Sequence, residues 1–294
     1  MRIFGGARRP LIFIGAQLVN VLFMGHVLAA SGVVDTKKAA PVAPPKGGTL
    51  NRNLGGEPSN LHPVMGLADY YSYLTFNYVC DSLMNRDYTD LSWKPHLAEK
   101  YEVSKDGKVY TFTLRKGLTF HDGKPITAED VKFSMDVIKI PEYNAAHMIP
   151  YFDGIEKIEV VDSLTIKFYL KDTYFKNFES IATQWIIPKA IYSDVQGTKK
   201  MTRTLTCSGP YVLEKFDRGQ VITLKRFPNW YGYSDPSWKS AYNFDRMNLR
   251  FYTEENVMIE HLKKGDLDFV ELNPEAYTTR TNGPEWGTKV IKVK

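Results

Sequence analysis

Three pairs of short segments constrain the fold of this chain most, because each pair alternates apolar with polar residues around a polar turn. In the first pair, 101–104 and 109–114 flank an Asp-Gly turn, and apolar residues alternate with threonine in the second segment. Such alternation with a period of two, interrupted by this turn, predicts a β-hairpin. The same pattern predicts hairpins over 158–170 and 212–226. The chain therefore contains antiparallel β-structure.

Helical periodicity occupies segments between these hairpins. Residues 68–84 place apolar side chains at i, i+3 and i+4, which predicts a helix with one core-facing stripe. Residues 253–264 predict another helix, and Gly265 suits the position just after its last turn. Thr127 and Asp130 have the spacing of a capping box, so a helix is expected to begin there.

Two short apolar segments complete this pattern. Residues 185–188 predict a buried strand that ends at Pro188, and residues 266–272 predict a strand after the last helix. Strands and helices are thus mixed along the whole body, with many antiparallel hairpins. The predicted fold class is mixed α/β (α+β).

Residues 1–30 have the parts of a secretory signal peptide: a basic start, a mostly apolar segment and a small-residue end. Cleavage after Ala29 fits this pattern, and cleavage after Ala30 fits it almost as well. The apolar segment is close to the ~18 residues that span a membrane, so an uncleaved anchor is the alternative. Residues 31–47 are rich in Pro and Ala, which predicts a flexible linker. We therefore expect a periplasmic protein.

The positive charge of the chain lies in these first segments. The formal net charge is +5 at pH 7. Residues 1–30 carry three arginines and no acid, and residues 31–46 carry three lysines and one aspartate. The remaining body is therefore neutral, and it does not predict a nucleic-acid partner.

The sequence lacks the motifs of common enzyme classes. No G-x-S-x-G, H-E-x-x-H, Walker loop or G-x-G-x-x-G occurs. The histidines beyond the leader are scattered singly, and for His121, in a turn, a structural hydrogen bond is favoured over metal ligation. The acids Glu129 and Asp130 are explained by a helix start. We expect a protein that is not an enzyme and that uses no metal or cofactor.

The chain has two cysteines, Cys80 and Cys207, and no C-x-x-C motif. An oxidising compartment permits a disulfide between them, but nothing in their spacing demands one. Cys80 lies in an apolar helical segment, where a small buried thiol is common. The residues alone leave open whether the two are bonded.

A long part of the body resembles a known family. Residues 95–101 read PHLAEKY, residues 104–117 read SKDGKVYTFTLRKG, and residues 120–131 read FHDGKPITAEDV. These segments closely resemble the signature of the extracellular solute-binding proteins of dipeptide, oligopeptide and nickel ABC importers, known as family 5. Shorter similar segments are 208–211 (SGPY), 226–231 (RFPNWY) and 264–269 (KGDLDF).

The resemblance implies a periplasmic binding protein-like fold of type II, in the peptide-binding class. By this pattern residues 48–272 are lobe one and residues 273–294 begin a truncated lobe two, so that most of the second lobe is absent. A fragment, a truncated gene and an unusual short form each account for this. Residues 242–245 look most like the subgroup that handles microcin C-type and other oligopeptides. Cys207 stands where the family usually has Gly, which leaves the disulfide open.

The resemblance also implies where a ligand binds. The family segment that lines the ligand backbone follows a Leu-Asp-Pro-like motif, here residues 61–63. The matching positions are Gly66, Leu67, Ala68 and Asp69. His62 replaces the usual acid, so Asp69 is the candidate partner for a peptide amino terminus; the alternative is that it only begins the helix. Tyr143 is a candidate to stack on the ligand, with core packing as the alternative.

The family mechanism implies a receptor that binds an extended peptide non-covalently, closes on it and delivers it to an ABC permease in the inner membrane. The complete protein is expected to be a monomer. Two alternatives stay open. One is a receptor of the same family for another solute, such as a metal chelate or an oligosaccharide. The other is a one-lobed remnant or interaction protein without a ligand.

Overall fold

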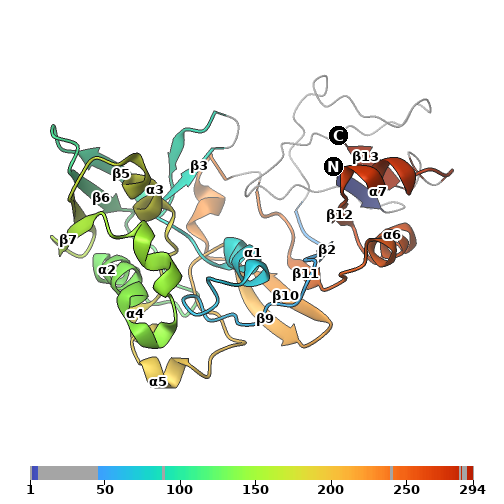
Figure 1. Ribbon diagram of the computed structural model, residues 1–294, viewed down its shortest axis with the longest axis horizontal. Helices are drawn as coiled ribbons and strands as arrows, with labels where there is room; N and C mark the ends of the chain where they lie inside the picture. Colours follow the sequence, from blue (N-terminus) through green and yellow to red (C-terminus); the bar gives the residue numbers. More distant parts are fainter. Residues whose placement is uncertain are drawn as a thin grey trace. The chain divides into compact units, whose positions relative to one another are not determined.

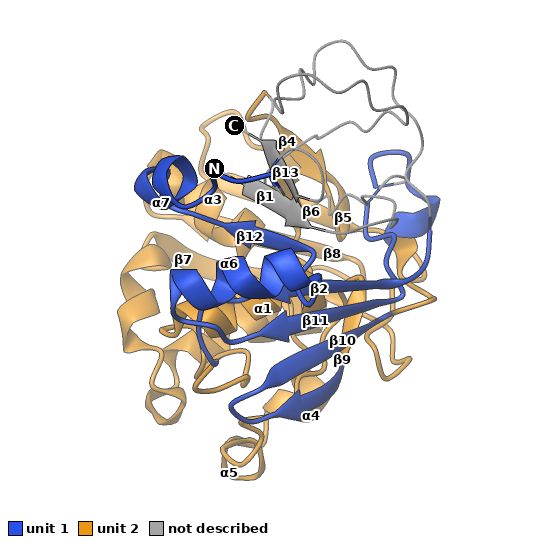
Figure 2. Ribbon diagram, turned by 90° about the vertical axis from the view of Figure 1, so that its right-hand side faces the viewer, with its two compact units in different colours: residues 1–57, 214–226, 232–294 blue, residues 58–213, 227–231 orange. Residues whose placement is uncertain are grey.

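The computed structural model describes residues 2–5, 46–87, 90–238, 241–284, 286 and 290–293. These residues form two compact units (Figure 2), each described by itself below. Unit 1 comprises residues 1–57, 214–226 and 232–294, and unit 2 comprises residues 58–213 and 227–231. The predicted body 48–272 is therefore shared between two units. Within the described residues, no helix is long and apolar enough to cross a membrane.

Unit 1 is built on a sheet whose described strands follow the order β13-β1-β12-β2-β11-β10-β9. Their bounds are β1 Arg2–Gly5, β2 Thr49–Asn53, β9 Tyr211–Asp217, β10 Val221–Arg226, β11 Arg246–Arg250, β12 Phe269–Glu271 and β13 Val290–Val293. Strands β2 and β11 are parallel, whereas β10 and β11 are antiparallel. The hairpin predicted over 212–226 is confirmed as β9 and β10.

Two helices of unit 1 pack on one another and on β12. They are α6 (Glu255–Lys264) and α7 (Pro274–Thr279). Helix α6 ends at Gly265, which has a φ of 83° and so adopts the left-handed conformation that the sequence predicted there. Their shared core contains Met258, Ile259, Leu262, Leu267, Val270, Leu272, Ala276 and Tyr277. The segment predicted to begin lobe two thus contributes α7 to the core of unit 1.

Unit 2 contains an antiparallel sheet of order β5-β6-β8-β7 (Figure 1). The strands are β5 Ala98–Val103, β6 Val109–Leu114, β7 Ile155–Val160 and β8 Thr165–Leu170. They confirm the two other predicted hairpins. Phe112, Leu114 and Phe168 are fully or almost fully buried on one face of this sheet. A separate antiparallel pair joins β3 (Met84–Arg86) to β4 (Trp93–Pro95).

Two α-helices of unit 2 pack on this sheet, one through contacts with β7 and β8 and the other through Phe178, whose ring stacks on that of Phe112. The α-helices are α1 Tyr70–Val79, α2 Ala128–Asp136, α3 Phe175–Thr183, α4 Lys189–Tyr192 and α5 Val195–Thr198. The short 3₁₀ helices are η1 Val137–Lys139, η2 Pro141–Tyr143 and η3 Ala146–Tyr151, and η4 Tyr231–Ser234 lies where the chain passes to unit 1. The predicted cap of α2 is confirmed, because Asp130 Oδ2 accepts from the Thr127 N–H at 2.9 Å.

Two predicted elements differ from the structure. The helix predicted over 68–84 is shorter, because Asp69 caps it and Cys80 is extended. The strand predicted over 185–188 is wrong: only an isolated bridge joins Trp185 to Ser82. The Ile186 N–H donates to Asp81 O at 2.9 Å, but the following N–H, that of Ile187, donates to the side chain of Ser134 at 2.9 Å, so the segment does not continue a ladder.

The predicted leader and linker lie mostly outside the described residues. Within residues 1–30, the structure describes only β1, which pairs antiparallel with β12 and β13. The cleavage positions Ala29 and Ala30 and nearly all of the linker 31–47 fall outside the described ranges. Signal peptide and linker therefore stay predictions.

Candidate functional site

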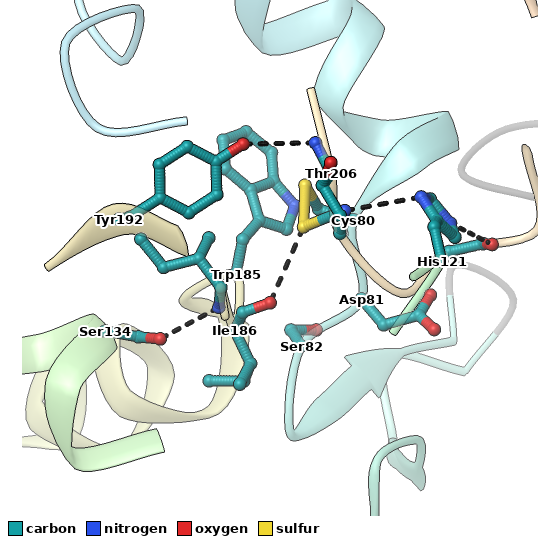
Figure 3. Close-up of a disulfide and its surroundings, with 12 residues drawn as sticks. Cys80, Asp81, Ser82, His121, Ser134, Trp185, Ile186, Tyr192 and Thr206 are labelled. Atoms are coloured by element: carbon teal, nitrogen blue, oxygen red, sulfur yellow. Dashed lines mark hydrogen bonds between the residues drawn. A yellow bond between two sulfur atoms is a disulfide. The ribbon is translucent and has the colours of Figure 1, made fainter. Parts of the chain in front are cut away.

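Cys80 and Cys207 form a disulfide in unit 2 (Figure 3). Both cysteines are buried, and their Cα atoms lie 5.0 Å apart. The bond joins the end of α1 to the loop 205–210, where the Gly209 N–H also donates to Val79 O at 2.8 Å. The disulfide thus links two residues that are 127 positions apart in the sequence, at the C-terminal end of the helix that follows the predicted ligand segment.

His121 fastens this loop to the turn that carries the FHDG sequence. Its Nδ1 accepts from the Cys207 N–H at 3.3 Å, so the ring N–H lies on Nε2 and donates to Gly209 O at 3.0 Å (Figure 3). Burial lowers the pKa of His121 to about 4, against the opposing effect of the Gly209 hydrogen bond. The expectation that His121 makes structural hydrogen bonds is confirmed.

A second buried histidine shapes the turn before α1. His62 Nδ1 accepts from the N–H groups of Val64 and Met65 at 3.2 and 3.3 Å. His62 thus supplies an acceptor of the kind that an aspartate offers in such a turn. Burial lowers the pKa of His62 to about 4. The neutral imidazole can therefore keep its acceptor at physiological pH.

We expect the free energy of unfolding to fall as the pH drops from about 6.5 toward about 4. His62 and His121 have a folded pKa of about 4, whereas histidine in an unfolded chain titrates near about 6.5. In that window the unfolded chain binds protons that the folded chain does not, so acid favours unfolding. Urea unfolding of the parent and of His121→Asn, at about pH 7 and about pH 4.5, measures this contribution. The variant should lose less stability between the two; an equal loss would contradict the assignment.

The exposure of the predicted ligand segment, residues 66–69, increases from Gly66 to Ala68. Gly66 is buried, and its N–H donates to His62 O at 2.8 Å. Leu67 is half-buried and Ala68 is exposed. Among the described residues, neither the N–H nor the C=O of Ala68 has a hydrogen-bond partner. The structure thus leaves the N–H and C=O groups of Ala68 open just before the start of α1.

Asp69 uses its carboxylate within the chain. Oδ1 accepts from the Ser72 N–H at 2.8 Å, which caps α1, and Oδ2 accepts from the Ser59 N–H at 3.0 Å. Burial raises the pKa of Asp69, but these hydrogen bonds outweigh it and hold the pKa below its usual value. The structure agrees with the capping alternative, and a role for Asp69 toward a peptide amino terminus stays a prediction.

Two tyrosines continue the open segment along α1. Tyr70 is 66% exposed and Tyr73 is 44% exposed. One turn apart, they lie on the same side of the helix, and the Tyr73 ring lies 4.9 Å from that of Trp185. We call Leu67, Ala68, Tyr70 and Tyr73 the α1 ledge. Neither tyrosine is among the binding residues predicted from the sequence, although both lie outside the predicted apolar stripe of 68–84, which indicates an exposed position.

Tyr143 does not join the α1 ledge. It is fully buried, its hydroxyl donates to Tyr192 O, and its ring lies 5.4 Å from that of His62. A side chain without exposed surface offers no face to a ligand in this conformation. The structure favours the packing alternative for Tyr143, and its role toward a ligand stays a prediction.

A buried carboxylate that the sequence analysis also missed holds residues 227–231 in unit 2. Asp81 Oδ2 accepts from the indole Nε1 of Trp230 at 2.9 Å, and Oδ1 lies 3.6 Å from Nε2 of His96. Burial raises the pKa of Asp81, and the Trp230 hydrogen bond offsets this in part. The group is enclosed, so it is structural. The described residues contain no group of three His, Cys, Asp or Glu able to hold a metal ion.

Comparison with known proteins identifies the family to which this chain belongs. Residues 92–286 match the bacterial extracellular solute-binding proteins, family 5. The chain belongs to this family. The family 5 match confirms the resemblance drawn from the PHLAEKY, SKDGKVYTFTLRKG and FHDGKPITAEDV segments, and the predicted mixed α/β fold is that of solved family members. Assignment to the microcin C-type subgroup stays a prediction.

Each relative described below matches this chain over only part of the relative's own length. A putative binding protein of Brucella melitensis is 32% identical over 185 residues, which cover 60% of this chain and 29% of the relative. The glutathione-binding protein GsiB of Salmonella choleraesuis is 32% identical over 186 residues, 61% of this chain and 34% of GsiB. The structure of AgaA from A. tumefacien R10, in complex with agropinic acid, has 31% identity and a TM-score of 0.64, covering 75% of this chain and 43% of AgaA. The chain thus spans less than half the length of these relatives.

Proposed function

We propose that this chain is the first-lobe part of a receptor that binds peptides non-covalently and delivers them to an ABC permease. The observation that carries the proposal is the α1 ledge. An extended peptide needs partners for its own N–H and C=O groups, and the open N–H and C=O of Ala68 offer both. The exposed rings of Tyr70 and Tyr73 offer apolar faces to the side chains beside that backbone.

The position of the α1 ledge in the sequence supports the same function. Leu67 and Ala68 are among the positions that the family pattern assigns to the ligand backbone, and the structure keeps them at the surface. The turn that presents them is held by His62, whose Nδ1 accepts from the N–H groups of Val64 and Met65. A rigid support of this kind reduces the ordering that a ligand must impose. Export to the periplasm, a permease partner and a monomeric complete protein belong to the same proposal.

The relatives favour a peptide and also supply the second candidate. GsiB is a glutathione-binding protein, and glutathione is a small peptide. AgaA was solved with agropinic acid, which is not a peptide, at a similar level of identity. A receptor for a non-peptide solute is therefore the alternative function. Metal chelates and oligosaccharides fall under the same alternative.

Replacing Tyr70 tests the peptide proposal without disturbing the core. Tyr70→Ala is expected to weaken binding of the tripeptide Ala-Phe-Ala by about fivefold, because one exposed aromatic contact is lost. Calorimetry on the full chain gives the affinity. Tyr174→Ala is the matched control, since Tyr174 is also in unit 2 and is 57% exposed.

The outcomes of that calorimetry separate the candidates. A loss in Tyr70→Ala with no change in Tyr174→Ala supports the α1 ledge as a peptide site. Binding of agropinic acid without binding of Ala-Phe-Ala or glutathione would favour the non-peptide receptor. Binding of none of the three would refute the peptide proposal for this chain and favour the one-lobed remnant or interaction protein.

A further inference from the structure

The segment that follows helix α7 in unit 1 contains the only Asn-Gly pair of the sequence, Asn282 and Gly283. Both residues are exposed. Glycine has no Cβ, so its backbone nitrogen is not shielded from the asparagine side chain before it. A bond between this nitrogen and the side-chain carbon Cγ of Asn282 would close a five-membered ring. The sequence therefore places a nucleophile beside an amide that it can reach.

The two reacting groups are available in the folded chain. Within the described residues, the Gly283 N–H donates to no acceptor, and no group donates to the side-chain oxygen of Asn282. The side-chain nitrogen of Asn282 donates to Thr278 O at 2.9 Å and to Thr279 O at 3.3 Å, which satisfies carbonyl groups in the last turn of α7. Both bonds engage the amide nitrogen, whereas the carbonyl group that a nucleophile attacks stays exposed to water.

Two other exposed asparagines lack this combination. Asn229 precedes Trp230, whose N–H already donates to Phe227 O at 3.2 Å. Asn144 precedes Ala145, which is buried and carries a Cβ beside its nitrogen. Exposure of the asparagine alone therefore does not single out Asn282. What distinguishes it is the glycine that follows, with an accessible nitrogen.

We propose that Asn282 is a site of spontaneous deamidation. The Gly283 nitrogen attacks Cγ of Asn282, and the new N–Cγ bond forms as the Cγ–Nδ2 bond breaks. The amide nitrogen leaves as ammonia, with the proton that the Gly283 nitrogen loses. Water then opens the cyclic imide at one of its two carbonyl groups, which gives an aspartate or an isoaspartate. No oxidant or reductant takes part, and solvent water is the co-reactant.

The reaction changes the contacts at the end of α7. A carboxylate replaces an amide that donates to Thr278 O and Thr279 O, so both hydrogen bonds are lost and a negative charge faces two carbonyl oxygens. The charge also lies at the C-terminal end of the helix, where the helix dipole disfavours anions. Helix α7 contributes Ala276 and Tyr277 to the core that it shares with α6. Deamidation therefore loosens a helix that belongs to the core of unit 1.

Ageing the full chain in a mildly alkaline buffer tests the site, because alkali favours deprotonation of the attacking nitrogen. Peptide mapping by mass spectrometry should find amide-to-acid conversion about tenfold faster at Asn282 than at Asn144. Asn282→Gln is the matched variant, because it keeps a side-chain amide but would have to close a larger ring; conversion at this position should fall about tenfold. Equal rates at Asn282 and Asn144, or an unchanged rate in Asn282→Gln, would overturn the proposal.

Asn282→Asp supplies one product directly and tests the effect on α7. Hydrogen–deuterium exchange in residues 274–282 should be about threefold faster in this variant than in the parent, with the hairpin 155–170 unchanged. Asn144→Asp is the control, because it adds the same charge at another exposed position, and it should leave exchange in residues 274–282 unchanged. Neither experiment contains a ligand, so the results do not depend on the proposed receptor function. Equal exchange in residues 274–282 of the parent and of Asn282→Asp would overturn the loosening of α7.

Discussion

Replacing both Cys80 and Cys207 with serine is expected to lower the free energy of unfolding of unit 2 by about 5 kcal/mol. The disulfide closes a chain separation of 127 residues, and a cross-link over so long a loop removes much of the entropy of the unfolded chain. Stabilities of whole domains are only about 5–15 kcal/mol, so the loss is a large share of the total.

Urea unfolding of the parent, the two single serine variants and the double variant measures this effect. All three variants should unfold at clearly lower urea concentrations, and the double variant should resemble the singles, because either replacement opens the loop. The same curves for the oxidised parent with and without a reductant give the cross-link contribution without a mutation. A loss below about 1 kcal/mol in every variant would show that the bond does not support the fold as described.

Replacing Gly66 with alanine is expected to cost about 3 kcal/mol of folding free energy and to abolish binding at the α1 ledge. A Cβ at this position would overlap the Asn60 carbonyl oxygen and would lie 2.9 Å from the His62 carbonyl oxygen. Both obstacles are backbone atoms, so no flexible side chain can move aside. The turn must shift, and with it the open N–H and C=O groups of Ala68.

Thermal unfolding and Ala-Phe-Ala calorimetry measure the two parts of this prediction. Ala68→Ser, two residues further on at an exposed position, is the control and should change stability by less than about 0.5 kcal/mol. A Gly66→Ala variant with the stability and affinity of the parent would show that the turn is not held as the structure describes.

Local patterns carried most of what the sequence predicted correctly. The three hairpins, the Thr127–Asp130 cap and the Gly265 helix end depend on neighbouring residues, whose alternation, turn chemistry and spacing are visible in the sequence. The segment 185–188 failed for the opposite reason. Its backbone binds Asp81 O and the Ser134 side chain, which are far away in the chain, and no periodicity records such partners.

In the candidate site, too, some residues are predicted from local sequence patterns and others depend on contacts made only in the folded chain. The family pattern led to Leu67 and Ala68, but the exposure of Tyr70 and Tyr73 depends on how α1 packs, and the burial of Tyr143 depends on Tyr192 and His62. Partners that meet only in the folded chain are what single-sequence reasoning misses.

Hydrogen–deuterium exchange of the full chain, with and without saturating Ala-Phe-Ala, tests the central claim most directly. The Ala68 N–H has no partner among the described residues, so it should exchange rapidly in the free chain. A bound extended peptide that pairs with this backbone should slow exchange in residues 67–73 and leave the hairpin 155–170 unchanged. Unchanged exchange in residues 67–73 at saturating peptide would contradict the assignment of the α1 ledge as the ligand site.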